Sequence, residues 1–229
     1  MIKKRQKKLI DYIKESASQK NEYNLFGKTV FIKDPLPENV SLENVFNKVE
    51  TLIPSFLFYN IDVIYVGDFN IFKEKNVNAL YADGAMYIIN KQDNDKDMID
   101  DIIHELAHAV EEQYGNEIYI DGQIEQEFLL KRQWLERNMR HHGFDTSGQD
   151  FFNTEYNKEL DDFFFWGVGY AFINANFSGK AFINAYQATS LREYFGIAFE
   201  TYYLGDRNYL SKICPKVYHK ISEIDSMGE

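Results

Sequence analysis

The stretch that decides the fold reads DMIDDIIHELAHAVEEQY and runs from Asp97 to Tyr114. Its apolar residues recur every three or four positions and form one stripe, as in an amphipathic helix. Asp97 suits the N-cap position, and Gly115 follows where a helix C-terminus is commonly capped. The spacing therefore predicts a helix over residues 97–114 that buries its apolar side.

This predicted helix carries the pentapeptide His104-Glu105-Leu106-Ala107-His108. Residues four apart stand one helical turn apart on the same face, so the two imidazoles can bind one ion, and neutral imidazole suits zinc. Glu105 lies about 100° round the helix, where a carboxylate can act as general base on a water molecule. The alternative is a surface helix that holds two histidines. The mid-helix position on a strongly amphipathic segment favours a site for one zinc ion.

A catalytic zinc site usually takes a third protein ligand and leaves one position for water. The extended pattern HExxHxxGxxH is absent, because Glu111 and Tyr114 stand where its glycine and last histidine belong. A carboxylate from a later helix is then the expected ligand. The predicted helix over residues 190–204 offers Glu193 and Glu200.

The segment Arg192-Glu193-Tyr194-Phe195-Gly196-Ile197-Ala198-Phe199 resembles the Glu-aromatic-Phe-small-x-Ala-Phe helix of the anthrax lethal factor family, which includes the Pro-Pro endopeptidases. In that family the leading Glu is the third zinc ligand, and a Tyr seven residues earlier points at the reacting carbonyl. Tyr186 stands seven residues before Glu193 in this sequence. The resemblance implies that the zinc ligands are His104, His108 and Glu193, that the base is Glu105, and that the oxyanion is stabilised by Tyr186.

The residues carried over from the family also have structural interpretations. Ser190 and Glu193 have the spacing of a capping box, in which Glu193 closes the N-terminus of its own helix. Glu200, two turns along a similar face, remains an alternative ligand. Tyr186 can also be interpreted as a core tyrosine whose hydroxyl is hydrogen-bonded to the backbone. Ile197 replaces a second Glu of lethal factor, which leaves a partner for the zinc ligands unidentified.

Shorter patterns indicate the rest of the fold, which we expect to be α+β. Residues 29–33 and 61–66 favour strands, and the Asp83-Gly84 pair between two β-prone runs predicts either a hairpin or a strand with a tight bend. Ser41 suits the N-cap of a helix that Pro54 ends. The resemblance implies a zincin-like fold with a small mixed sheet, an active-site helix and a mostly helical C-terminal lobe.

Within that fold, the resemblance makes residues 84–89 the edge strand before the active-site helix. An extended substrate is then expected to add a strand near Met86 to Asn90. The expected division of the chain is an N-terminal arm or helix over residues 1–24 and a single catalytic domain over residues 25–229. Its parts are a sheet and HExxH lobe over 25–115 and a helical lobe over 116–229, with an insertion at about 140–180 that can reshape the substrate groove.

Composition narrows the class of protein. The 229 residues fit one domain, or two lobes that share a core, and 45% of them are apolar. A single cysteine, Cys214, excludes an internal disulfide and a cysteine-based zinc site. The run Phe163-Phe164-Phe165-Trp166 is expected to lie in the core, because large apolar side chains usually do.

The charge balance bears on partners and location. The net charge is −11, and five positive charges lie within the first eight residues, so the remainder is more acidic still. An acidic body repels phosphate, and nucleic acid is therefore not an expected partner. Residues 9–15 are charged and amphipathic, which argues against a cleavable signal peptide, and no apolar run approaches a membrane span. We expect a cytoplasmic protein, or one secreted or delivered without a cleavable signal.

Taken together, these features predict a zinc metalloendopeptidase with a peptide or protein substrate. The alternative is a catalytically silent protein of the same fold that serves in binding or assembly. Cleavage of a peptide library separates the two.

Overall fold

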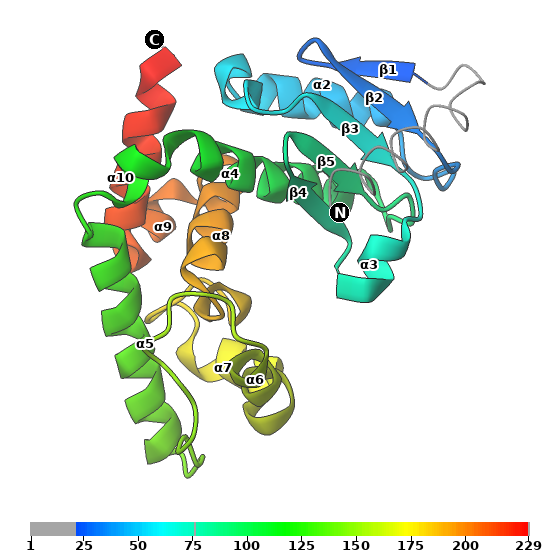
Figure 1. Ribbon diagram of the computed structural model, residues 1–229. Coiled ribbons are helices and arrows are strands. Elements are labelled where there is room, and N and C mark those ends of the chain that lie inside the picture. Colours follow the sequence, from blue (N-terminus) through cyan, green and yellow to red (C-terminus); the bar gives the residue numbers. More distant parts are fainter. Residues whose placement is uncertain (1–21, 76, 229) are drawn as a thin grey trace, which may run out of the picture. The chain divides into compact units, whose positions relative to one another are not determined.

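The computed structural model describes residues 22–75 and 77–228, whose elements form two compact units (Figure 1). The first unit ends at Ala109 and the second begins at Val110, so the division falls inside helix α4 (Asp95–Tyr119). The expected N-terminal arm lies outside the described residues, except that residues 22–24 belong to strand β1. Helices and strands are both present, as the α+β prediction requires.

The first unit is built on a five-stranded sheet with the order β1-β2-β3-β5-β4. The outer pairs β1/β2 and β4/β5 are antiparallel, whereas β2, β3 and β5 run parallel, so the predicted mixed sheet is confirmed. The strands are β1 (Glu22–Leu25), β2 (Lys28–Ile32), β3 (Val63–Val66), β4 (Ala79–Ala82) and β5 (Ala85–Ile88).

The predicted hairpin joins β4 and β5 through Asp83 and Gly84. Both residues have positive φ, 50° and 78°, as a tight two-residue hairpin turn requires. A Cβ atom on Gly84 would lie 2.7 Å from Oδ2 of Asp62, so this position also needs glycine for space. The turn folds β4 back along the open side of β5. The prediction that residues 84–89 form the edge strand is therefore wrong, because β5 is interior and β4 is the edge.

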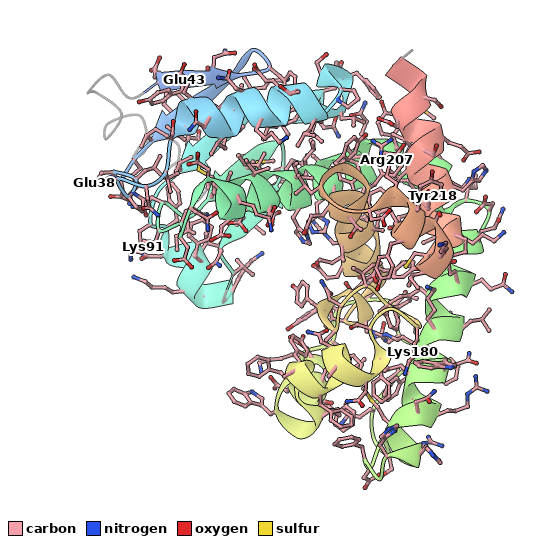
Figure 2. The ribbon with its side chains drawn as sticks, turned by 180° about the vertical axis from the view of Figure 1, so that it is seen from behind. Glu38, Glu43, Lys91, Lys180, Arg207 and Tyr218 are labelled. Atoms are coloured by element: carbon pink, nitrogen blue, oxygen red, sulfur yellow. The ribbon has the colours of Figure 1, made fainter. Side chains whose placement is uncertain are left out.

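The centre of one face of the sheet is buried. Val30, Ile64 and Met86 pair across β2, β3 and β5 and are 0% exposed. Helices α2 (Leu42–Leu52) and α4 lie on this side, as Figures 1 and 2 show from opposite directions. Each brings an apolar stripe that keeps water from the strands.

Helix α2 begins and ends where the sequence predicts. The hydroxyl of Ser41 accepts a hydrogen bond from the Asn44 N–H at 3.3 Å, which satisfies one of the free donors of the first turn. The helix stops before Pro54. A short 3₁₀ turn, η1 (Ser55–Phe58), then leads towards β3.

The opposite face of the sheet carries an aromatic row. Phe31, Tyr65 and Tyr87 stand side by side on three strands, with ring centroids 5.7 and 5.3 Å apart. Phe69 and Phe72, at the start of helix α3 (Asn70–Lys75) and within it, form a second apolar cluster with Tyr65. This cluster is separate from the layer under α2 and α4.

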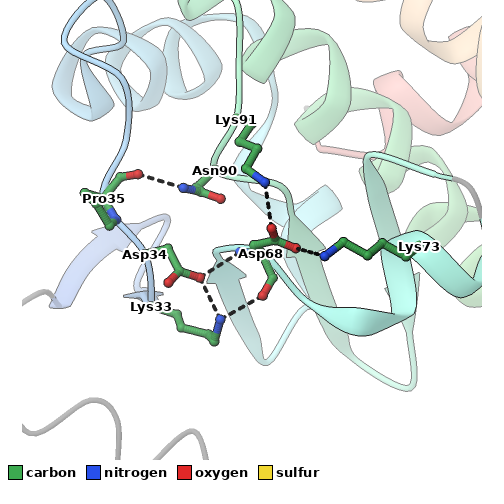
Figure 3. Close-up of polar contacts among 7 residues, drawn as sticks. All are labelled: Lys33, Asp34, Pro35, Asp68, Lys73, Asn90 and Lys91. Atoms are coloured by element: carbon green, nitrogen blue, oxygen red, sulfur yellow. Dashed lines mark hydrogen bonds and ion pairs between the residues drawn. The ribbon is translucent and has the colours of Figure 1, made fainter.

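A polar cluster joins the ends of β2 and β3 (Figure 3). The Lys33 ammonium donates to Oδ2 of Asp34 at 2.6 Å and to the Asp68 carbonyl at 2.7 Å. Asp34 in turn accepts from the Asp68 N–H at 2.8 Å, and Lys91 pairs with the Asp68 carboxylate. These contacts hold the loops at one end of the sheet, although exposed ion pairs each contribute only about 0–1 kcal/mol.

Helix α4 begins earlier than predicted, and a kink marks its predicted end. Its N-cap is Asn94, whose side-chain oxygen accepts from the N–H groups of Lys96 and Asp97, so the prediction of Asp97 as N-cap is wrong. With Asn94 as the N-cap, Asp95 and Asp97 lie in the first turn of the helix, where acidic side chains interact favourably with the helix dipole. At the other end the chain kinks at Tyr114 and continues in helical form to Tyr119.

The second unit is helical. At the centre of this unit, α8 (Leu191–Leu204) packs against α5 (Gln123–His141), α9 (Arg207–Ile213) and α10 (Pro215–Asp225). Most side chains of α8 from Tyr194 to Tyr203 are buried. The elements after α4 are α5 (Gln123–His141), α6 (Lys158–Asp162), a π-helix (Phe163–Val168), α7 (Tyr170–Phe177), the 3₁₀ turn η3 (Tyr186–Ala188), α8 (Leu191–Leu204), α9 (Arg207–Ile213), α10 (Pro215–Asp225) and the 3₁₀ turn η4 (Ser226–Gly228).

The expectation that the Phe163–Trp166 run lies in the core is only half right. Phe164 is fully buried, but Phe165 and Trp166 are 48% and 78% exposed. The run forms one turn of π-helix, closed by the Gly169 N–H on the Phe164 carbonyl at 2.9 Å. A single turn presents side chains in all directions, so four consecutive aromatic residues cannot all face the same core.

Among the described residues, no helix is both long enough and apolar enough to cross a bilayer.

Candidate metal centre

The two motif histidines lie on adjacent turns of α4, as the sequence predicts. His108 is buried and His104 half-buried. Their ring centroids are 5.0 Å apart and the ring planes are nearly perpendicular, at 89°. Both residues follow the fully buried stripe of Ile102 and Ile103, which holds this part of the helix against the sheet. The helix thus presents the two imidazoles together on one side.

Glu105 occupies a different environment from the histidines. Its side chain is buried, with 7% exposure, and Oε2 accepts a hydrogen bond from the Tyr81 N–H at 2.5 Å. Tyr81 lies on the edge strand β4, opposite Met86 of β5. The strand backbone therefore fixes the carboxylate of Glu105 beside the histidine pair, at an orientation that the motif alone does not determine.

Glu193 lies in the first turn of α8. The Ser190 hydroxyl accepts a hydrogen bond from the Glu193 N–H at 3.1 Å, so one half of the predicted capping box is present. This contact uses the backbone of Glu193 and the side chain of Ser190. The Ser190 hydroxyl thus satisfies one of the free N–H donors at the start of α8.

His104, His108 and Glu193 are brought together: one ligand atom of each lies within 4.8 Å of those of the other two. Two imidazole nitrogens and one carboxylate oxygen are a common protein ligand set for a catalytic zinc ion. The donor chemistry therefore fits the metal that the sequence predicts. Glu200, the alternative third ligand, does not belong to this group or to another such group in the described parts of the chain.

Glu111 lies beside this group, one turn beyond His108 on α4. Its carboxylate accepts a hydrogen bond from the Tyr119 hydroxyl and lies 4.0 Å from the Arg192 guanidinium. Burial raises the pKa of Glu111 to about 7, and the charge of Glu193 acts in the same direction, whereas the Tyr119 hydrogen bond and Arg192 oppose the rise. The first turn of α8 and this part of α4 are therefore coupled electrostatically.

Tyr186 begins η3, the short turn that precedes α8. Its carbonyl accepts from the Thr189 N–H at 3.0 Å and from the Thr189 hydroxyl at 2.8 Å. The next residue, Gln187, is fully buried, and its side chain bonds the Tyr194 carbonyl and the Ile183 N–H. These contacts hold the backbone on either side of Tyr186 in a fixed position relative to α8, the helix that carries Glu193.

Arg132 of α5 is a residue that sequence reasoning missed. It is fully buried and donates to the carbonyls of Ala188, Thr189 and Asn153 at 2.8, 2.5 and 2.7 Å. It therefore holds the segment between Tyr186 and α8. A charged residue in mid-helix normally indicates a solvated face, so only its place among the buried positions of α5 could have identified it.

Neither the comparison with protein-family models nor the comparison with curated proteins finds a match to this chain.

Proposed function

We propose that the chain is a zinc-dependent metalloendopeptidase with a zincin-like fold, similar to the anthrax lethal factor family. The observation that carries the proposal is the convergence of His104, His108 and Glu193, with the buried acid Glu105 next to the first histidine. Each of these residues comes from a motif that the sequence singles out independently. A cluster formed by chance would not be expected to draw its residues from both motifs.

The proposed chemistry assigns a role to each side chain. Zinc, when bound, supplies a Lewis acid that lowers the pKa of a water molecule to about 7. Glu105 accepts the proton of the attacking water and passes it to the amine that leaves. Tyr186 donates its hydroxyl hydrogen to the oxygen on which negative charge develops. His104, His108 and Glu193 would hold the metal.

The Tyr81 hydrogen bond supports the role of Glu105 as a base. A buried carboxylate that accepts a hydrogen bond from a backbone N–H keeps its orientation beside the histidine pair. The same contact places the base next to β4, the edge strand, and we place the extended substrate there rather than along β5. Main-chain hydrogen bonds to such an edge give affinity without fixing sequence.

The test is the substitution Glu105→Gln in the full-length protein. Peptide cleavage is expected to fall by about 10²–10⁴-fold, because a general base contributes that factor. Zinc content, measured by metal analysis, should stay at one ion per chain. Retained cleavage in this variant would remove Glu105 from the mechanism. If the unsubstituted protein binds zinc but cuts no peptide of a broad library, the silent binding protein becomes the better assignment.

A further inference from the structure

A polar and aromatic cluster lies between α5 and α8, within the part of the chain (about 140–180) where we predict an insertion relative to the lethal factor family. At its centre is Asp161 of α6. One oxygen of its carboxylate accepts from the Tyr156 hydroxyl at 2.7 Å, and the other accepts from the Tyr170 hydroxyl. A carboxylate has about four acceptor positions, so two remain for another donor. The tyrosines hold Asp161 in one orientation and leave it able to bind a ligand.

Aromatic rings adjoin one of the tyrosines that donate to this carboxylate. Phe165 of the π-helix packs against the ring of Tyr170, with ring centroids 5.4 Å apart, and against Trp166, with centroids 4.5 Å apart. The Tyr170 hydroxyl in turn bonds Asp161. An acidic group therefore has a wall of exposed aromatic side chains beside it.

Asp161 carries a negative charge that the protein does not neutralise. Within residues 22–75 and 77–228, no lysine or arginine forms an ion pair with it, and the neighbouring Lys158 pairs with Asp162 at 2.6 Å. The surrounding segment, residues 150–166, holds five acidic residues and one lysine. Charge complementarity thus favours a cationic ligand over an anionic or purely apolar one.

Hydrogen bonds attach this cluster to the residues that flank the proposed metal centre. The Leu191 N–H, two residues before Glu193, donates to the Thr154 carbonyl at 2.8 Å. On the other side, the Ala185 N–H, next to Tyr186, donates to the side chain of Asn174, one turn along α7 from Tyr170, at 2.7 Å. The two tyrosines that hold Asp161 therefore come from segments anchored beside Glu193 and Tyr186.

We propose that Asp161, with Phe165, Trp166 and Tyr170, forms a subsite for a basic side chain of the peptide substrate, arginine above all. A guanidinium can donate to a carboxylate and stack on aromatic rings at the same time, a combination that neutral side chains lack. The inference rests on the proposed peptidase function, because it is the peptide in that site that supplies the arginine.

The experiment measures peptide binding separately from cleavage. The full-length, zinc-loaded Glu105→Gln variant is titrated with five sets of blocked pentapeptides. Each set holds arginine at one position and a mixture of residues elsewhere, and a matched series has citrulline, which keeps the shape of arginine but not its charge. At one peptide position at least, the peptides with arginine are expected to bind roughly tenfold more tightly than the matched peptides with citrulline.

Substitutions identify the residues responsible. Asp161→Asn and Trp166→Ala, introduced separately into the same variant, should abolish the preference for arginine. Asp162→Asn is the matched control: it removes a neighbouring acid that already has a lysine partner and should keep the preference. Equal affinity for arginine and citrulline at all five positions, or a preference that survives Asp161→Asn, overturns the inference.

Cleavage of the same peptides by the unsubstituted protein distinguishes the two proposals. Cleavage without any advantage for arginine overturns the subsite and leaves the peptidase in place. Binding that prefers arginine through Asp161, without cleavage of any peptide, supports the subsite and overturns the peptidase.

Discussion

Glu105 and Glu193 are two acids near the same pair of histidines, and their surroundings differ. Glu105 is buried on α4 and bonded to the strand backbone at Tyr81, which suits a residue that moves a proton. Glu193 is half-buried at the start of α8, and its carboxylate joins the histidine nitrogens in one group. The HExxH spacing predicts Glu105 as the base, and the family resemblance predicts Glu193 as the third ligand, with Glu200 left as the alternative. The fold adds the contact of Glu105 with Tyr81 and groups Glu193 with the histidines.

The choice between Glu193 and Glu200 as third ligand can be measured directly. Glu193→Ala is expected to weaken zinc binding by more than about 100-fold, since even indirect partners of a metal contribute 10–100-fold. Glu200→Ala, the matched control on the same helix, should leave the affinity unchanged. Equilibrium dialysis against a zinc buffer gives both values. Loss of zinc in the Glu200 variant alone would contradict the assignment and the family resemblance with it.

Glu111 is expected to make the stability of the metal-free protein depend on pH. Its pKa is raised to about 7 in the folded state, from 4.5, so the folded state holds the proton more tightly than the unfolded chain does. The free energy of unfolding should therefore fall as pH rises from about 4.5 to 7, by roughly 3 kcal/mol at most. Urea denaturation of Glu111→Gln should lack this decline.

Glu112→Gln is the control for this measurement, because Glu112 is the exposed neighbour on the same helix. It should retain the pH dependence of the unsubstituted protein. The same slope in the Glu111 and Glu112 variants would mean that another group is responsible.

At the scale of elements, the position of η3 depends on α5 as well as on α8. Arg132 of α5 donates hydrogen bonds to the backbone carbonyls of Ala188, Thr189 and Asn153. Burial lowers the pKa of Arg132 to about 10, so its guanidinium stays protonated at neutral pH. Removing the guanidinium would leave buried carbonyls without donors, a cost of about 1–3 kcal/mol each.

Arg132→Met is therefore expected to lower the free energy of unfolding by about 3 kcal/mol or more. Arg137→Met, an exposed position on the same helix, should change it by less than about 0.5 kcal/mol. Chemical denaturation followed by circular dichroism measures both. An equal effect of the two substitutions would show that the three carbonyls do not depend on Arg132.

Elements with local signals were predictable, and those fixed by distant contacts were not. The cap at Ser41 and the Asp83-Gly84 turn depend on adjacent residues, and both predictions are confirmed. The identity of the edge strand depends on which side of β5 the hairpin occupies, and nothing within residues 84–89 encodes that. The burial of Arg132 likewise depends on carbonyls more than 20 residues away in sequence.

For the molecule as a whole, zinc should act as a stabilising ligand. A ligand that binds only the folded state adds about 2.7 kcal/mol when its concentration is 100 times its Kd. For a chain of this length, that is a rise in Tm of roughly 5–10 °C. Differential scanning calorimetry with zinc and with a chelator measures the shift. Glu193→Ala should reduce it, and an undiminished shift would place the ion elsewhere.

The contact between Tyr81 and Glu105 also has a consequence for strand pairing at this edge of the sheet. In β4, the Tyr81 N–H points away from β5, because the hairpin bonds use Asn78, Leu80 and Ala82. An outward N–H on an edge strand can recruit a strand from another molecule and start aggregation. Here the Glu105 carboxylate of the same chain occupies that donor, so any strand that pairs with β4, a peptide substrate included, has to use the other backbone groups of this edge.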